Sequence, residues 1–259
     1  MTRSESKSVI VTGSGRGIGR AIALRLARDG FSVLVNDFDV EPGAEVVTEI
    51  QNAGGIAIAN NADVTDEDQV RVMVEQATSE FGQVDVMIAN AGIGKQMRIT
   101  ETSWDDFDKI LKVNLYGAFL CGREAARHMV PRERGKIIFA ASTSGRRGAP
   151  FQAAYCSSKF GIVGLTQSMA RELGRIGITV NAYCPGIVNT QMWEEVDRER
   201  SRLMGKPRGT ALKQAIESIA LGRMEEPEDV ANFVSFLAGP DSDYVTGQAM
   251  CVAGGVHMA

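Results

Sequence analysis

The sequence predicts a doubly wound α/β fold, in which about seven parallel strands carry helices on both faces. Two observations carry this prediction. Short runs of β-branched residues alternate with longer amphipathic stretches along the 259 residues, and a glycine-rich turn joins the first strand to the first helix. Hydrophobic residues make up 44% of the chain, enough for one large core, so we expect a single domain over residues 1–259.

The expected strands are the short apolar runs, which lie at Val9–Thr12, Phe31–Asn36, Ile56–Asn60, Val84–Ala89, Lys136–Ala141, Ile178–Ala182 and Ala249–Val252. The expected helices are the amphipathic stretches between them, at Ile18–Arg28, 42–53, Asp66–Phe81, 103–129, 153–174, 211–220 and Pro227–Leu237. A cap at Thr65 or Asp66 would open the third of these helices. Residues 186–211 lack a clean period and are rich in charge, so we expect a mobile substrate lid over residues 187–215. Met192, Trp193 and Val196 are spaced to form one apolar face that would close over the substrate, and a plain surface helix is the alternative.

Composition argues against several classes of function. The formal net charge is -4, so the chain as a whole does not attract nucleic acid or an anionic membrane. Its apolar runs are too short to span a bilayer, and its polar start does not resemble a signal peptide. The four cysteines form no C-x-x-C pair, which fits a reducing, cytoplasmic setting. With only two histidines, we expect no metal site.

The turn after the first strand reads Thr12-Gly13-Ser14-Gly15-Arg16-Gly17-Ile18-Gly19 and leads directly into a helix. Glycines let the backbone approach a pyrophosphate, and the helix N-terminus offers free N–H groups and a partial positive charge. The strict G-x-G-x-x-G spacing is absent, because Ile18 stands where the third glycine would fall. The strand before the turn and the acid after the second strand still favour a Rossmann-type dinucleotide site. Its first contacts would be Gly13, Gly15, Arg16, Gly17, Ile18 and Gly19.

A tyrosine and a lysine stand one helical turn apart in the helix expected at 153–174. Tyr155 and Lys159 would leave the same face of that helix. A phenol titrates near a pKa of about 10, and a neighbouring cation favours the phenolate. The pair alone is a common feature of helix surfaces, but Ser142 stands thirteen positions earlier, at the end of the fifth expected strand.

With these residues in view, the sequence resembles the short-chain dehydrogenase/reductase family over nearly its whole length. The shared motifs are T-G-x-x-x-G-I-G at Thr12–Gly19, Asp63-Val64, Asn90-Ala91-Gly92, Asn114, Ser142, Tyr155 with Lys159, and Pro185-Gly186 followed by Thr190. Each motif has an ordinary structural explanation, but their joint occurrence in this order is specific. The resemblance implies an NAD(P)-dependent oxidoreductase that acts on CH–OH groups.

Four catalytic residues follow from the resemblance. Tyr155 would exchange the proton with the substrate oxygen, as acid in reduction and as base in oxidation. Lys159 would stabilise the phenolate and bond the nicotinamide ribose, while Ser142 would polarise the carbonyl. Asn114 would hold a water that links Lys159 to solvent. Hydride passes directly between cofactor and substrate carbon, so the resemblance implies no metal.

The resemblance also implies the remaining cofactor contacts. The residues bordering the adenine and its ribose would be Asp63, Val64, Asn90, Ala91 and Gly92. The residues meeting the nicotinamide would be Pro185, Gly186, Ile187, Val188 and Thr190.

Two residues give opposite indications of which dinucleotide is used. Asp37 follows the second strand, where a carboxylate would accept from both ribose hydroxyls of NAD and repel the 2′-phosphate of NADP. Arg16 favours NADP, because relatives that use it often carry a basic residue there. We weigh Asp37 more heavily, since Arg16 can swing to solvent or pair with the acid, and Asp39 adds repulsion. NAD is the expected cofactor.

Substrate choice rests on similarity to one branch of the family. The stretch Tyr183–Trp193 and the segments 226–230 and 240–244 are similar to acetoin reductase/butanediol dehydrogenase and polyol dehydrogenases. A small vicinal diol, hydroxyketone or polyol is therefore expected. Alternatives are a 3-oxoacyl-thioester reductase and a non-catalytic dinucleotide-binding sensor. Arg146 and Arg147, beside the expected mouth of the site, would either meet a carboxylate or be solvated.

The long helices also predict assembly. Their apolar faces exceed what one sheet face needs to cover, and the family resemblance points to a homotetramer with 222 symmetry. The residues that suggest this are Met129, Val130, Phe160, Val163, Met169 and Val256–Ala259.

Overall fold

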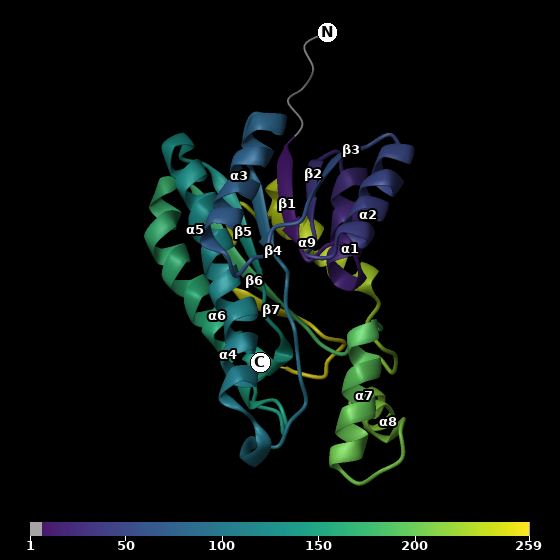
Figure 1. Ribbon diagram of the computed structural model, residues 1–259. Helices are drawn as coiled ribbons and strands as arrows, with labels where there is room; N and C mark the ends of the chain where they lie inside the picture. Colours follow the sequence, from purple (N-terminus) through teal and green to yellow (C-terminus); the bar gives the residue numbers. More distant parts are fainter. Residues whose placement is uncertain (1–6, 259) are drawn as a thin grey trace.

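The computed structural model describes residues 7–258, which form a seven-stranded parallel sheet with helices on both faces (Figure 1). The strands are β1 (Ser8–Thr12), β2 (Ser32–Asn36), β3 (Ile56–Asn60), β4 (Val86–Ala89), β5 (Gly135–Ala140), β6 (Ile178–Pro185) and β7 (Ala249–Val252). They lie in the order β3-β2-β1-β4-β5-β6-β7. The direction of winding reverses between β1 and β4, and ligands of such sheets bind outside the carboxyl ends at that point.

The helices are α1 (Gly17–Arg28), α2 (Val40–Asn52), α3 (Glu67–Phe81), α4 (Trp104–Leu111), α5 (Gly117–Met129), α6 (Ala153–Leu173), α7 (Gln191–Leu203), α8 (Thr210–Glu217) and α9 (Pro227–Ala238). Apart from α7 and α8, they form two layers, one on each face of the sheet (Figure 1). Figure 1 shows α1, α2 and α9 on one side and α3 to α6 on the other. Each helix within residues 7–258 is too short or too polar to cross a lipid bilayer.

The strands are buried on both faces, because each face packs against a helix layer. Val9 and Val11 of β1 belong to the core beneath α1 and α9, whereas Ile10 belongs to the core beneath α3 and α5. This alternation explains why the strands read as continuous apolar runs in the sequence. The predicted doubly wound α/β fold is confirmed.

Two segments differ from the sequence expectation. The helix expected at 103–129 is α4 and α5, joined by a π-helical turn over Lys112–Tyr116. Residues 186–211, in which the sequence shows no clean period, contain the regular helix α7. Asp197 explains the second difference: its buried carboxylate accepts hydrogen bonds from the backbone N–H groups of Gly209 at 2.8 Å and Leu212 at 2.9 Å. A buried charge therefore joins α7 to α8, where a helical period would need an apolar stripe.

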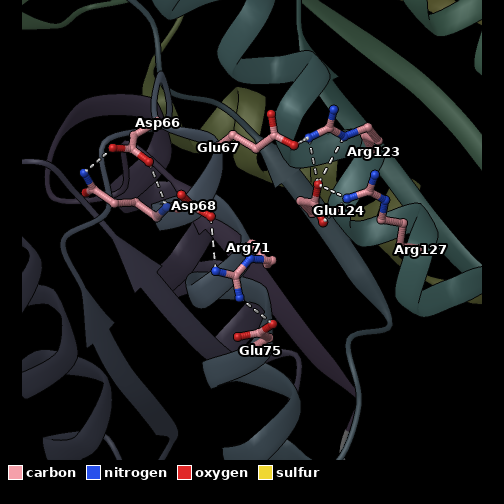
Figure 2. Close-up of polar contacts among 9 residues, drawn as sticks. Asp66, Glu67, Asp68, Arg71, Glu75, Arg123, Glu124 and Arg127 are labelled. Atoms are coloured by element: carbon pink, nitrogen blue, oxygen red, sulfur yellow. Dashed lines mark hydrogen bonds and ion pairs between the residues drawn. The ribbon is translucent and has the colours of Figure 1, made fainter.

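Ion pairs on the outer surface tie α3 to α5 (Figure 2). Glu124 of α5 is almost fully buried, and the guanidinium groups of Arg123 and Arg127 each donate to it at 2.9 Å. Arg123 also donates to Glu67 on α3. The buried pairs of Glu124 lie within α5, and the single contact from Arg123 to the exposed Glu67 links α5 to α3 at the surface.

Candidate active site

The glycine turn lies at the carboxyl end of β1 and packs against the end of β4. Gly13 has a φ of +61°, and a Cβ there would lie 2.8 Å from the Cα of Ala91. A Cβ on Gly19 would lie 2.1 Å from the carbonyl oxygen of Gly13. Backbone thus packs directly on backbone, and the N-terminus of α1 is left to face an anion. These features fit the pyrophosphate of a dinucleotide.

Asn90 joins three strands at this edge of the sheet. Its amide nitrogen donates to the carbonyl oxygens of Thr12 at 2.9 Å and Gly13 at 3.0 Å. Its amide oxygen accepts from the hydroxyl of Tyr183 on β6 at 2.8 Å. The Thr12 hydroxyl accepts from the backbone N–H groups of Asn90 and Ala91. The structure thus places Asn90 and Ala91 beside the turn, and adds Tyr183, to which the sequence analysis gave no role.

Asp37 lies at the carboxyl end of β2, directly beside the glycine turn. One carboxylate oxygen accepts from the backbone N–H of Gly15 at 2.8 Å, and the other accepts from Asp39 N at 3.1 Å. Arg16 does not pair with Asp37; its guanidinium donates to Asp39 at 2.6 Å, on the exposed surface. Asp37 is therefore fixed in position, while the charge of Arg16 is offset by a neighbouring acid.

Asp63 and Val64 follow β3 at the same edge. The Asp63 carboxylate accepts from both the backbone N–H and the hydroxyl of Thr65, each at 2.8 Å. Val64 is buried, and a Cβ on Gly117 would lie 2.8 Å from its Cγ2. The pair therefore links the end of β3 to the start of α5. Asp66 caps α3 as expected, accepting from the backbone N–H of Gln69.

Tyr155, Lys159 and Ser142 meet where the start of α6 crosses the end of β5. The Ser142 side chain lies close enough to the Tyr155 phenol to act on its pKa through a hydrogen bond. The Lys159 ammonium lies 5.6 Å from the centroid of the Tyr155 ring. The same ammonium donates to the carbonyl oxygen of Ala140 at 2.7 Å, which anchors it to the end of β5. The three residues that the sequence analysis placed together are thus together in space.

Burial shapes the titration of this group. Burial raises the pKa of the Tyr155 phenol, while the hydrogen bond with Ser142 lowers it. Burial also lowers the pKa of the Lys159 ammonium to about 8. Tyr155 is therefore protonated at neutral pH, which suits a proton donor to a carbonyl oxygen. Positive charge on Lys159 favours the phenolate that oxidation requires.

Asn114 lies in the π-helical turn, a type of local irregularity that is frequent at functional sites. Its amide nitrogen donates to the Ile93 carbonyl oxygen at 2.9 Å and to the Ser158 hydroxyl at 3.1 Å, and its amide oxygen accepts from Ile93 N. A Cβ on Gly92 would lie 3.3 Å from the Asn114 oxygen and 3.5 Å from the Lys159 nitrogen. Asn114 and Lys159 therefore flank Gly92.

The segment Pro185–Thr190 closes the site from the side of β6. A Cβ on Gly17 would lie 3.4 Å from Thr190 Cγ2, so this segment lies against the glycine turn. The backbone N–H of Gly186 donates to the carboxylate of Glu225 at 2.9 Å. Sequence reasoning missed Glu225, because the contact joins positions 39 residues apart without a recognisable motif.

The two arginines after Ser142 have different surroundings. Arg146 is half-buried, and its guanidinium donates to the carbonyl oxygen of Ala249 on β7 at 3.3 Å. Arg147 is exposed. Arg146 thus supports the end of the sheet, and Arg147 alone presents a charge to solvent. Within residues 7–258, no cluster of three His, Cys, Asp or Glu side chains is placed to bind a metal ion.

Comparison with known proteins identifies the family. The family model described as enoyl-(acyl carrier protein) reductase matches residues 13–257. An L-2,3-butanediol dehydrogenase of Corynebacterium glutamicum is 44% identical, over 97% of this chain and 98% of its own. A 3-oxoacyl-(acyl-carrier-protein) reductase of Staphylococcus aureus is 40% identical, over 98% of this chain and 99% of its own. The chain belongs to the short-chain dehydrogenase/reductase family.

The fold of this short-chain dehydrogenase/reductase agrees with a solved relative. A variant of actinorhodin polyketide ketoreductase, crystallised with NADPH, superposes with a TM-score of 0.94 at 33% identity and covers 99% of both chains. The protein is therefore an oxidoreductase that acts on CH–OH groups with a nicotinamide dinucleotide. The expected family, fold and reaction class are confirmed, and a non-catalytic sensor is not supported.

Tyr183→Phe tests whether the hydrogen bonds of Asn90 support the cofactor site. The change leaves the half-buried amide oxygen of Asn90 without its donor, which costs about 1–3 kcal/mol when the acceptor stays unpaired. We expect dinucleotide binding to weaken by about threefold to tenfold, because the glycine turn loses part of its support. Fluorescence titration with reduced dinucleotide measures this. Tyr244→Phe is the control, since Tyr244 is fully exposed. Equal affinity of both variants for the reduced dinucleotide would show that the bond from Tyr183 to Asn90 does not support the cofactor site.

Proposed function

We propose that this enzyme interconverts small vicinal diols or polyols and their hydroxyketones, using NAD(H). The observation that carries the proposal is the placement of Tyr155 against Ser142 and beside Lys159, at the carboxyl edge of the sheet. The substrate class is supported by the 44% identical relative, which is named an L-2,3-butanediol dehydrogenase.

The proposed chemistry uses hydroxyl groups on both sides of the substrate oxygen. In reduction, Tyr155 gives its proton to that oxygen while Ser142 donates a hydrogen bond to it. In oxidation, Tyr155 takes the proton back, and Lys159 stabilises the phenolate. The bound nicotinamide supplies or accepts the hydride. Asn114, beside Lys159, would hold the water through which the proton reaches solvent.

The proposed cofactor contacts follow the carboxyl edge of the sheet from β2 to β6. The glycine turn and the N-terminus of α1 would hold the pyrophosphate. Asp63, Val64 and Asn90 would border the adenosine half. Ile187, Val188 and Thr190 would meet the carboxamide of the nicotinamide.

A second candidate activity is reduction of a 3-oxoacyl thioester. It is favoured by the S. aureus relative at 40% identity. Such an enzyme needs a basic surface for an acidic carrier protein. The net charge of -4 and the engagement of Arg146 with β7 weigh against it.

A substrate panel with a catalytic variant tests the function. We expect turnover of acetoin, diacetyl or 2,3-butanediol with catalytic efficiency above that for a 3-oxoacyl thioester. Tyr155→Phe should keep cofactor affinity and cost at least about a hundredfold in turnover, as loss of a positioned acid/base does. Lys159→Ala should move the rise of oxidation with pH to higher pH. A higher catalytic efficiency with the thioester would contradict the proposed diol or polyol substrate. Normal turnover by Tyr155→Phe would contradict the proposed role of Tyr155.

NAD(H) is the proposed dinucleotide. The fixed carboxylate of Asp37 and the pairing of Arg16 with Asp39 support it. A solved relative with NADPH represents the alternative. Asp37→Ser should narrow the preference for NADH over NADPH, because the carboxylate that repels a 2′-phosphate is removed. The ratio of catalytic efficiencies with NADH and NADPH measures this in wild type and variant. A wild type that prefers NADPH would contradict the assignment.

We propose a homotetramer as the assembly, but with a different set of interface residues from the set that the sequence suggested. Met129 is fully buried in the core and cannot face a partner, whereas Phe160 is exposed as expected. Tyr116 and Phe119, in the helical segment over Lys112–Met129, are also exposed. Ala259 lies outside the described residues. Sedimentation velocity at micromolar concentration should show four copies. Substituting Phe119 and Phe160 by Ser should yield smaller species, and a wild-type monomer would refute the assembly.

A lid over residues 187–215 is also proposed. In Figure 1, α7 and α8 lie together beyond the carboxyl ends of the strands. Arg98, in the loop after β4, donates to the carbonyl oxygen of Leu203 at 2.7 Å and so connects α7 to the body. Trp193 and Val196 are half-buried on α7. Trp193→Ala should raise KM for the best substrate, while exposed Glu195→Ala should not. Unchanged kinetics in Trp193→Ala would remove this residue from the lid.

The free thiols of the cysteines support a reducing, cytoplasmic location. Cys121, Cys156, Cys184 and Cys251 are all free thiols. Fractionation of cells that produce the protein would test the location directly.

A further inference from the structure

Glu225 is a buried acid that the proposed mechanism leaves unused. It stands just before α9 and is only 7% exposed. Carboxylates are rarely buried to this degree without ion-pair partners, because burial removes their hydration. One of its oxygens, Oε1, has no hydrogen-bond partner among the described residues. Such a group needs a structural explanation.

The other carboxylate oxygen of Glu225 is bound to the segment proposed to meet the nicotinamide. Oε2 accepts from the backbone N–H of Gly186 at 2.9 Å. The same N–H lies 3.2 Å from the carbonyl oxygen of Val252, so β7 and Glu225 share it. The backbone of Glu225 adds two further bonds: its N–H donates to Ile187 O, and its carbonyl oxygen accepts from Asn189 N. Residues 186–189 are thus held from one side by a single residue.

The groups around the carboxyl are mostly apolar. Ile187, Val252 and Ala253 line a cavity of about 240 Å³ with it. The charged groups that face it are Arg223 in the preceding loop and Asp229 on α9, which form an ion pair with each other at 2.6 Å. Arg223 is therefore already engaged, and β6 and β7 bring no charge to the cavity lining.

From these contacts we infer that Glu225 is a positioning residue for the nicotinamide: its carboxylate fixes the backbone at Gly186 so that Ile187 and Val188 present their polar groups to the carboxamide. The inference rests on the proposed cofactor contacts. It makes the strength of nicotinamide binding depend on the charge of one carboxyl group, because a hydrogen bond to a charged acceptor is about twice as strong as one to a neutral acceptor.

The charge of Glu225 changes within the working range of pH. Burial raises the pKa of this carboxyl to about 7, while the Gly186 N–H opposes the shift. A raised pKa means that the carboxyl is protonated below about pH 7 and charged above it. The bond to Gly186 is therefore stronger on the alkaline side, and nicotinamide binding should weaken as the pH falls.

Three variants separate charge from structure. Glu225→Gln removes the charge and keeps an acceptor oxygen, and Glu225→Ala removes both. Glu228→Gln is the matched control, because Glu228 is an exposed acid on the first turn of α9, away from Gly186. Each protein is titrated with the reduced dinucleotide that wild type binds more tightly, between about pH 6 and about pH 8.5. The same titration is run with ADP-ribose, or its 2′-phosphate, which lacks the nicotinamide.

We expect the Kd of wild type and Glu228→Gln to rise by about threefold to tenfold from high to low pH. At every pH, Glu225→Gln should bind the dinucleotide with the weaker affinity that wild type shows at low pH. Glu225→Ala should bind it more weakly still. ADP-ribose should bind all four proteins equally. A pH profile of Glu225→Gln that matches wild type, or an equal loss for ADP-ribose, would overturn the inference.

Hydrogen exchange tests the same inference without any ligand. Amides in the peptide 183–190 should exchange faster in Glu225→Gln than in wild type at about pH 8, with Glu228→Gln unchanged. Unchanged exchange in Glu225→Gln overturns the inference. Neither readout uses an alcohol or ketone, so failure of the proposed substrate class would not be mistaken for failure of this inference.

Discussion

The site depends on the side chain of Asn90, which joins three strands at the carboxyl edge of the sheet. It donates to Thr12 and Gly13 at the end of β1 and accepts from Tyr183 on β6. A Cβ on Gly19 would lie 2.5 Å from its amide nitrogen, so α1 can start this close only with glycine there. The path of the glycine turn and the start of α1 are thus set by one amide. Because β4 lies between β1 and β5, the same amide also places this turn relative to Ser142 and Tyr155.

Buried polar groups fix the other parts of the site. Lys159 is anchored to the carbonyl of Ala140, Asn114 to Ile93 and Ser158, and Asp197 to the start of α8. Such groups are costly to bury unless they are bonded, so each one strongly favours a single arrangement of its neighbours. The apolar core alone would allow small shifts of helix against sheet. The buried bonds give the reacting groups the precise placement that acid/base chemistry needs.

Much of the fold was predictable from the chain. The seven strands and most helix bounds follow from local patterns, because a parallel strand between two helix layers must be apolar on both faces. Tyr155 and Lys159 were predictable as a pair, since four residues make one helical turn. The π-helical turn at Asn114 was not, and the hydrogen bonds of Asn114 there join it to Ile93 and Ser158, which lie on other segments of the chain. Likewise, the sequence left α7 open between a lid and a surface helix, because the buried side of this helix carries the acid Asp197.

By itself, the sequence determined the order of the elements, the glycine turn and the family to which the motifs belong. These features are local, and each is written in a run of a few residues. Only the tertiary structure decided that Tyr183 supports Asn90, that Arg16 pairs with Asp39 and that Glu225 holds Gly186. Each of these contacts joins residues more than 20 positions apart. Their geometry depends on how the strands align, and no periodic pattern in the chain records it.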